Sequence, residues 1–93
     1  MDTIVRKRYR FSGGVQGVGF RWTCINKAMA LGLTGWVRNE RNGSVTVEVQ
    51  GDQDTIDKLI MFMKRNRFIW VDSISVEDAP IEENEASFTV RYR

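Results

Sequence analysis

The sequence predicts an α+β fold in which two helices cover one face of an antiparallel sheet. Three observations lead to this prediction. Apolar residues alternate with polar ones over 4–12, 44–50 and 88–92, as in strands with one buried face. Apolar residues recur at helical spacing over 21–31 and 53–65. An Asn-Gly pair at 42–43 separates two strand-like segments and indicates a β-hairpin.

The first predicted strand, 4–12, has two contrasting sides. Val5, Lys7, Tyr9 and Phe11 lie on one side, and Arg6, Arg8 and Arg10 lie on the other. We expect the arginine side to face solvent. The first helix, 21–31, is expected to bury Ile25, Ala28 and Met29 and to end at Gly32, since glycine is common just past a helix end.

Residues 35–39 and 44–50 form the predicted hairpin. The second helix, 53–65, carries an apolar stripe made of Ile56, Leu59, Ile60 and Met63. Asp52 is placed to cap its first turn. A strand at 71–77 follows, with Ile74 and Val76 facing inward, and then a short final strand with Phe88, Val90 and Tyr92. The order βαββαβ plus a short C-terminal strand predicts a ferredoxin-like sandwich.

The composition limits the classes of function. The length of 93 residues predicts one domain, 1–93. A net charge of +2 suits an anionic ligand but lacks the dense basic block of a strong nucleic-acid binder. The N-terminus resembles no signal peptide, and no stretch approaches the ~20 apolar residues of a membrane span. We expect a cytoplasmic protein with no membrane or nucleic-acid partner. We also expect a monomer, although edge strands leave pairing with another copy open.

The chain contains no histidine and one cysteine. This excludes Ser-His and Cys-His nucleophile pairs and an intrachain disulfide, and it excludes most zinc sites. Asp52, Asp54 and Asp57 lack the spacing of a calcium loop and fit helix capping better. We expect neither a metal nor a cofactor. The chemistry is left to arginine, lysine, amide and carboxylate side chains and to backbone amides.

Four of the seven residues at 13–19 are glycine. Backbone amides in such a loop can form a concave anion site, and the helix that follows adds its own free amides. Arg21 stands where a guanidinium could bind phosphate through two donors. The loop lacks the Gly-Lys-Ser/Thr of a P-loop, and position 22 is Trp, so the GxGxxG pattern fails as well. From loop composition alone, a tight turn without a ligand is the more frequent explanation.

Two motifs resemble the signatures of the acylphosphatase family. The first reads Gly13-Gly14-Val15-Gln16-Gly17-Val18-Gly19-Phe20-Arg21, and the second reads Gly35-Trp36-Val37-Arg38-Asn39, followed by Gly43, Val45 and Gly51. Relatives commonly carry a basic residue at position 14, and they carry a Gly-Pro pair after the second helix where this chain has Asn66 to Trp70. The resemblance covers the full chain.

The resemblance implies metal-independent hydrolysis of small acyl phosphates to a carboxylate and inorganic phosphate. The implied catalytic residues are Arg21, which holds phosphate, and Asn39, which orients water. The implied substrate-binding residues are Gly14, Val15, Gln16, Gly17, Val18, Gly19, Phe20 and Arg21. The side chain of Gln16 is expected to face solvent, so that only its backbone amide contributes, and Phe20 is expected in the core. Cys24 is expected to be buried, and Trp22, Trp36 and Trp70 partly buried.

Two alternatives remain open. The first is a non-catalytic phosphate- or acyl-phosphate-binding domain of the same fold, since domains of this kind also occur within larger enzymes. The second is an RNA-recognition module, which would stack bases on sheet aromatics. The strand 44–50 has no aromatic residue and carries Glu48, which disfavours the second alternative.

Overall fold

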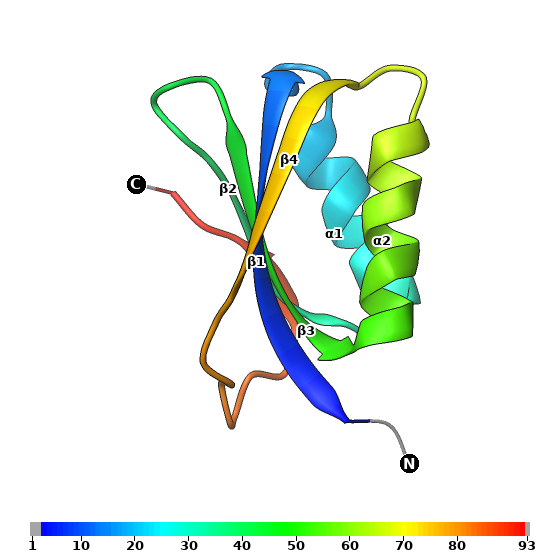
Figure 1. The fold of residues 1–93 in the computed structure, drawn as a ribbon, viewed down its shortest axis with the longest axis vertical. Coiled ribbons are helices and arrows are strands. Elements are labelled where there is room, and N and C mark those ends of the chain that lie inside the picture. Colours follow the sequence, from blue (N-terminus) through cyan, green and yellow to red (C-terminus); the bar gives the residue numbers. More distant parts are fainter. Residues whose placement is uncertain (1–2, 93) are drawn as a thin grey trace.

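The computed structural model describes residues 3–92, so Met1, Asp2 and Arg93 of the predicted domain lie outside the described residues. The elements follow in the order β1 (Ile4–Gly14), α1 (Phe20–Ala30), β2 (Thr34–Asn39), β3 (Val45–Asp52), α2 (Gln53–Arg65), β4 (Trp70–Asp78) and β5 (Phe88–Val90). Both helices lie on the same face of one sheet (Figure 1). The predicted element order and ferredoxin-like sandwich are confirmed.

The sheet has the strand order β4-β1-β3-β2-β5. Its first four strands are antiparallel, as predicted, but β5 pairs parallel to β2, so the sheet is mixed. The chain leaves β4 at one edge and crosses through 79–87 to the opposite edge (Figure 1). Because this crossing stays at the end of the sheet where β4 finishes, β5 runs back in the direction of β2.

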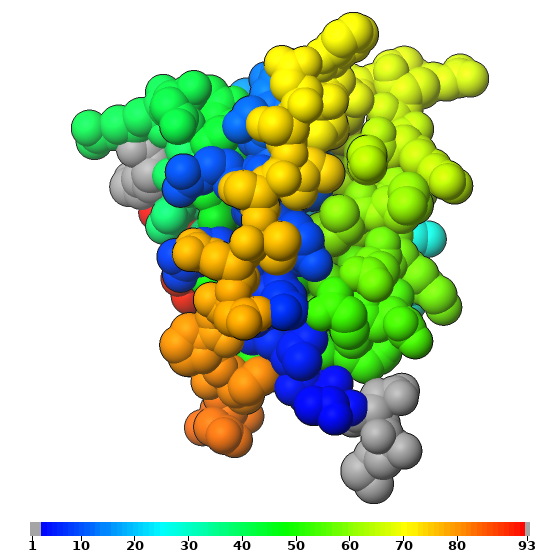
Figure 2. Space-filling view, viewed as in Figure 1, coloured from blue at the N-terminus to red at the C-terminus, as the bar shows by residue number. Residues whose placement is uncertain are grey.

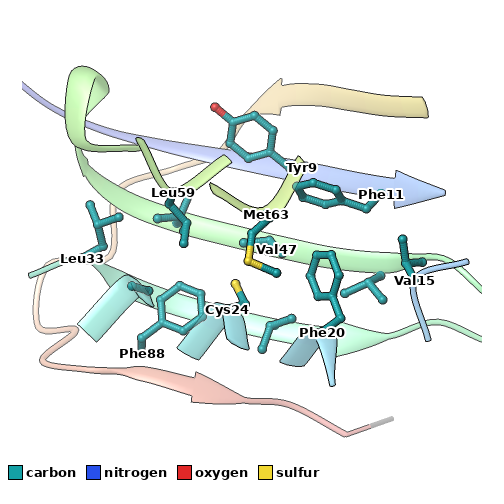
Figure 3. Close-up of a cluster of buried hydrophobic side chains, with 14 of the residues drawn as sticks. Tyr9, Phe11, Val15, Phe20, Cys24, Leu33, Val47, Leu59, Met63 and Phe88 are labelled. Atoms are coloured by element: carbon teal, nitrogen blue, oxygen red, sulfur yellow. The ribbon is translucent and has the colours of Figure 1, made fainter. Parts of the chain in front are cut away.

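The core fills the space between the sheet and the helices. Figure 3 shows Phe11 and Val47 of the sheet facing Cys24, Leu59 and Met63 of the helices. In α2 the predicted stripe faces the core: Ile56, Leu59 and Met63 are buried, and Ile60 is partly buried. The Asp52 carboxylate accepts a hydrogen bond from the Thr55 amide at 3.1 Å, as expected of an N-cap.

In α1 the core-facing residues differ partly from the prediction. Phe20, Cys24 and Ala28 are buried, whereas Met29 is 61% exposed. The prediction placed the start of the helix one residue late and missed Phe20, whose ring packs edge-on against Phe11 at 5.0 Å. Once Phe20 defines the inward direction, positions four and eight further on share its face.

The edge strand β4 buries less than expected. Ile74 packs against the core, but Val76 is 57% exposed. Val76 pairs with Tyr9 on the helix side, yet it lies in a strand with a neighbour on one side only. Figure 2 shows this strand crossing the exposed front of the molecule. A shift in its register opposite Ser12 and Gly13 further interrupts the alternation that the prediction assumed.

The expectation that Arg6 faces solvent is wrong. Its side chain is fully buried, and its Nε donates to Glu48 Oε2 at 2.5 Å while its Nη1 donates to Glu85 Oε1 at 2.7 Å. Arg8, which is exposed as expected, donates to the other Glu48 oxygen at 2.7 Å. The face of the sheet opposite the helices is called the open face. Glu85 belongs to the crossing segment 79–87, which covers the part of this face that carries Arg6. The network therefore fastens that segment to the sheet.

Glu48 makes the stability of the fold depend on pH. Burial alone would raise the pKa of Glu48, but hydrogen bonds from Arg6 and Arg8 outweigh it and hold the pKa below the usual 4.5. A carboxylate with a lowered folded-state pKa stabilises the fold above its unfolded pKa, and this contribution is lost as pH falls through the folded value. We expect urea unfolding to show wild-type stability falling more than that of Glu48→Gln between about pH 6 and about pH 3. Equal losses in both proteins would contradict this role.

Candidate functional site

The glycine-rich loop connects β1 to α1 at one end of the molecule (Figure 1). Gly17 and Gly19 have φ angles of 75° and 78°, a left-handed conformation that residues with a side chain rarely adopt. Left-handed residues within a loop can turn successive amides toward a common point. Val15 fixes the base of the loop because its side chain is buried in the core beside Phe20 (Figure 3).

The N-terminus of α1 adds further donors. A helix leaves its first amides without intrahelical acceptors. Within residues 3–92, no side chain caps these amides, and the first turn contains no acidic residue. The positive end of the helix dipole is therefore directed at the space beside the loop.

Arg21 and Asn39 line the same cleft, which has a volume of about 270 Å³. Arg21 comes from the first turn of α1, and Asn39 is the last residue of β2. The Arg21 guanidinium lies 5.7 Å from the centre of the Tyr92 ring. The cleft is lined by Val15, Gly17, Gly19, Phe20, Arg21, Trp22, Ile25, Asn39, Val90 and Tyr92.

Three expected substrate-binding residues do not line this cleft. Gly14 ends β1 in register with Trp70, Val18 is 40% exposed on the loop, and Gln16 points elsewhere. A larger groove of about 580 Å³ lies between α1 and α2 and includes Lys27 and Phe62, but no residue of the glycine-rich loop lines it. The smaller cleft is the candidate site because it alone among the pockets described here combines Arg21 with Asn39.

Gln16 corrects a further expectation, because its side chain does not simply face solvent. Its Nε2 donates to the carbonyl oxygens of Glu40 at 2.7 Å and Ser44 at 2.9 Å. These residues close the β2–β3 hairpin through a backbone hydrogen bond of 2.9 Å from the Glu40 amide to the Ser44 carbonyl. Gln16 thus connects the glycine-rich loop to the hairpin that carries Asn39. The contact joins distant parts of the chain, so no local sequence signal could reveal it.

We expect Gln16→Glu to loosen this connection. The variant is nearly isosteric, but it replaces two donated hydrogen bonds with a carboxylate beside two carbonyl oxygens. Loss of one such contact costs about 1–3 kcal/mol, which corresponds to a factor of about 5 to 150, so kcat/KM should fall at least about fivefold. Steady-state kinetics would measure this, with Gln53→Glu at the start of α2 as a matched control. Equal activity of the two variants would rule out a bracing role for Gln16.

The burial of the aromatic side chains and of the cysteine agrees only partly with expectation. Phe20 and Cys24 are buried as expected, and burial raises the pKa of the Cys24 thiol, which disfavours a nucleophilic role. Trp36 is only 3% exposed, whereas Trp22 and Trp70 are 72% and 71% exposed, so the expectation of partial burial is wrong for all three. Ile25, Val90 and Tyr92 were not foreseen as cleft residues, because the last two reach it only through the pairing of β5 with β2.

The described residues meet neither the requirements of a metal site nor those of a membrane-spanning helix. Within residues 3–92, no three His, Cys, Asp or Glu side chains gather closely enough to hold a metal ion. No helix in the described part of the chain has the length and apolar character needed to cross a membrane.

The fold and the cleft define a ferredoxin-like α+β protein with a cationic cleft at the start of its first helix. A family model described as acylphosphatase matches residues 7–90. An acylphosphatase of Caldivirga maquilingensis is 45% identical over 94 residues, covering 99% of each chain. The crystal structure of the acylphosphatase from Bacillus subtilis superposes with a TM-score of 0.87 at 30% identity, covering 97% of this chain and all of that one.

The chain belongs to the acylphosphatase family. This confirms the family that the two sequence motifs predicted. It also confirms the predicted class of enzyme, a hydrolase. The same fold also occurs in a longer protein: full-length HypF, in a phosphate- and nucleotide-bound form, matches with a TM-score of 0.87 at 28% identity, and the match covers 98% of this chain but 12% of HypF.

Proposed function

We propose that the cleft containing Arg21 and Asn39 hydrolyses small acyl phosphates without a metal ion. The observation that carries the proposal is the joint presence of both side chains in one cleft at the N-terminus of α1. The phosphate lies against the amides of 14–20 and the Arg21 guanidinium. Asn39 holds the attacking water.

The phosphate is bound by charge-assisted hydrogen bonds. Each such bond contributes about 1.5–3 kcal/mol, so several amides and one arginine suffice to hold a dianion. The planar guanidinium offers two parallel donors to the phosphate oxygens. The uncapped start of α1 adds the favourable end of its dipole. Of the loop glycines, Gly17 and Gly19 line the cleft itself. Gly14, Gln16 and Val18 lie outside its lining, and the proposal assigns them backbone amides only.

The reaction needs little covalent help from the protein. For R-CO-OPO₃²⁻ + H₂O → R-COO⁻ + H₂PO₄⁻, the water oxygen forms a bond to phosphorus as the bond from phosphorus to the bridging oxygen breaks. The bonding electron pair leaves with the carboxylate, and both water protons end on the phosphate. A carboxylate is a good leaving group, so positioning and charge stabilisation are sufficient. Asn39 is too weak a base to ionise water and therefore acts by orienting it.

The alternative of a silent binding domain has one supporting observation, the recurrence of the fold as a small part of HypF. The presence of both Arg21 and Asn39 in the cleft favours the enzyme. An RNA platform is disfavoured because the open face offers no exposed aromatic residue on β3, and Trp36 of β2 is buried. A cytoplasmic monomer without nucleic-acid partners remains part of the proposal.

Hydrolysis of benzoyl phosphate in excess chelator tests the function directly. We expect turnover to be unchanged by the chelator, because the proposed site relies on amides and a guanidinium. The assay would follow the loss of benzoyl phosphate with and without chelator, and inorganic phosphate should inhibit competitively. Turnover abolished by chelator and restored by a divalent cation would refute the metal-free mechanism. A folded chain that binds phosphate without turnover would instead support the silent domain.

A further inference from the structure

The outer rim of the cleft is apolar and carries an exposed tryptophan. Trp22 and Ile25 of α1 line the cleft beside Arg21, and Val90 and Tyr92 line it from the final strand segment. Trp22 is 72% exposed although its indole is the largest side chain in the cleft. A charged phosphate group gains no stabilisation from apolar side chains. This part of the cleft is therefore suited to the acyl group of an acyl phosphate.

Trp22 and Asn39 border the cleft from opposite layers of the molecule. In α1 the side chain of Phe20 faces the sheet, and position 22 lies about 200° further round the helix axis. Trp22 therefore stands on the outer surface of the helix layer. Asn39 ends β2, which belongs to the sheet layer.

This arrangement determines where the leaving group goes. In phosphoryl transfer the attacking and leaving oxygens lie roughly in line across phosphorus. If Asn39 holds the water on the sheet side, the acyl carboxylate leaves on the opposite side, toward the outer surface of α1. The acyl group of a bound substrate is then directed at Trp22.

We propose that Trp22 forms an acyl subsite that selects substrates with a flat apolar acyl group, such as benzoyl, over a small one, such as acetyl. The inference rests on the proposed function. The indole offers a rigid flat surface on which an aromatic acyl group can stack. Trp22 is thus a specificity-determining residue, separate from the phosphate-binding groups.

A second groove extends the same rim. Trp22 also borders a groove of about 370 Å³ that continues along α1 past Asn26 and Ala30 to Phe62 of α2. Among the described residues, none that lines this groove is acidic. The space beyond Trp22 can therefore accommodate an apolar acyl group longer than benzoyl without opposing the charge of the phosphate.

The test compares kcat/KM for benzoyl phosphate and acetyl phosphate in the wild type, Trp22→Ala, Trp22→Phe and Trp70→Ala. We expect Trp22→Ala to lower the benzoyl-to-acetyl ratio about five- to tenfold, the size of a lost aromatic contact. Trp22→Phe should retain most of the ratio. Trp70 is equally exposed but lies outside the cleft, so Trp70→Ala should keep the wild-type ratio. Competitive inhibition by inorganic phosphate should be the same in all four proteins.

Each outcome of this experiment decides a separate question. An active wild type whose ratio is unchanged in Trp22→Ala, or falls as much in Trp70→Ala, would overturn the acyl subsite and leave the proposed function standing. A change in phosphate inhibition confined to Trp22→Ala would assign Trp22 to the phosphate site instead and would also overturn the subsite. A wild type that hydrolyses neither substrate would overturn the proposed function, and the subsite with it.

Discussion

Replacing Arg21 with alanine is expected to lower kcat/KM by roughly 10²–10³-fold, the usual effect of removing one group that stabilises charge in a transition state. Among the described residues that line the cleft, Arg21 is the one with a cationic side chain. Its loss weakens phosphate binding and the stabilisation of the charge that develops on the phosphate oxygens. KM should rise and kcat should fall together. Steady-state kinetics with benzoyl phosphate and competitive inhibition by inorganic phosphate measure the two effects.

Two further variants sharpen the Arg21 prediction. Arg21→Lys keeps the charge but loses the two parallel donors, and it should recover only part of the activity. Arg10→Ala removes the same net charge from the exposed open face and should leave both constants near the wild-type values. The lost contact with Tyr92 is worth only about 1 kcal/mol, so all variants should remain folded in thermal unfolding. An Arg21→Ala enzyme as active as Arg10→Ala would remove Arg21 from the site.

Replacing Asn39 with alanine is expected to lower kcat about a hundredfold, which is the effect that a misplacement of about 1 Å can have on a reacting group. The affinity for inorganic phosphate should remain unchanged, because the loop amides and Arg21 are intact. This separates Asn39 from Arg21, whose loss affects both quantities. The assays are kcat for benzoyl phosphate and the inhibition constant of phosphate.

The matched control for Asn39 is Asn84→Ala, since Asn84 lies exposed in the crossing segment away from the cleft. It should retain full turnover. Asn39→Asp provides a second measure, because a carboxylate can still orient water but repels the phosphate dianion, so KM should rise. If Asn39→Ala kept wild-type kcat, the water would have to be oriented by another group.

Local patterns in the sequence predicted the helices and strands but not all of the segments that pack against them. The stripe of α2 and its cap at Asp52 are confirmed, since each depends on residues within one or two helical turns. The prediction places Arg6 in solvent because alternation distinguishes the two sides of a strand but does not show what covers each side. The segment that covers it contributes Glu85, 79 positions away, and no periodicity reports such a contact.

For the candidate site, too, the sequence predicted the residues within its motifs but not the contacts between distant parts of the chain. The two family motifs supplied Arg21 and Asn39, and the structure places both in one cleft. The side chains of Gln16, Trp22 and Tyr92 were misplaced or missed, because their surroundings depend on the hairpin and on the parallel pairing of β5. Motifs identify the groups that contact phosphate, whereas the groups that frame them follow from tertiary structure.

The pairing of β5 with β2 also has a consequence for synthesis of the chain. Val90 and Tyr92 line the cleft, and within residues 3–92 they come after the other residues that line it. During translation, the glycine-rich loop and the hairpin emerge from the ribosome long before the strand that completes the cleft. A nascent chain can therefore form most of its sheet while the cleft is still incomplete, and the site is completed only when residues 88–92 dock against β2.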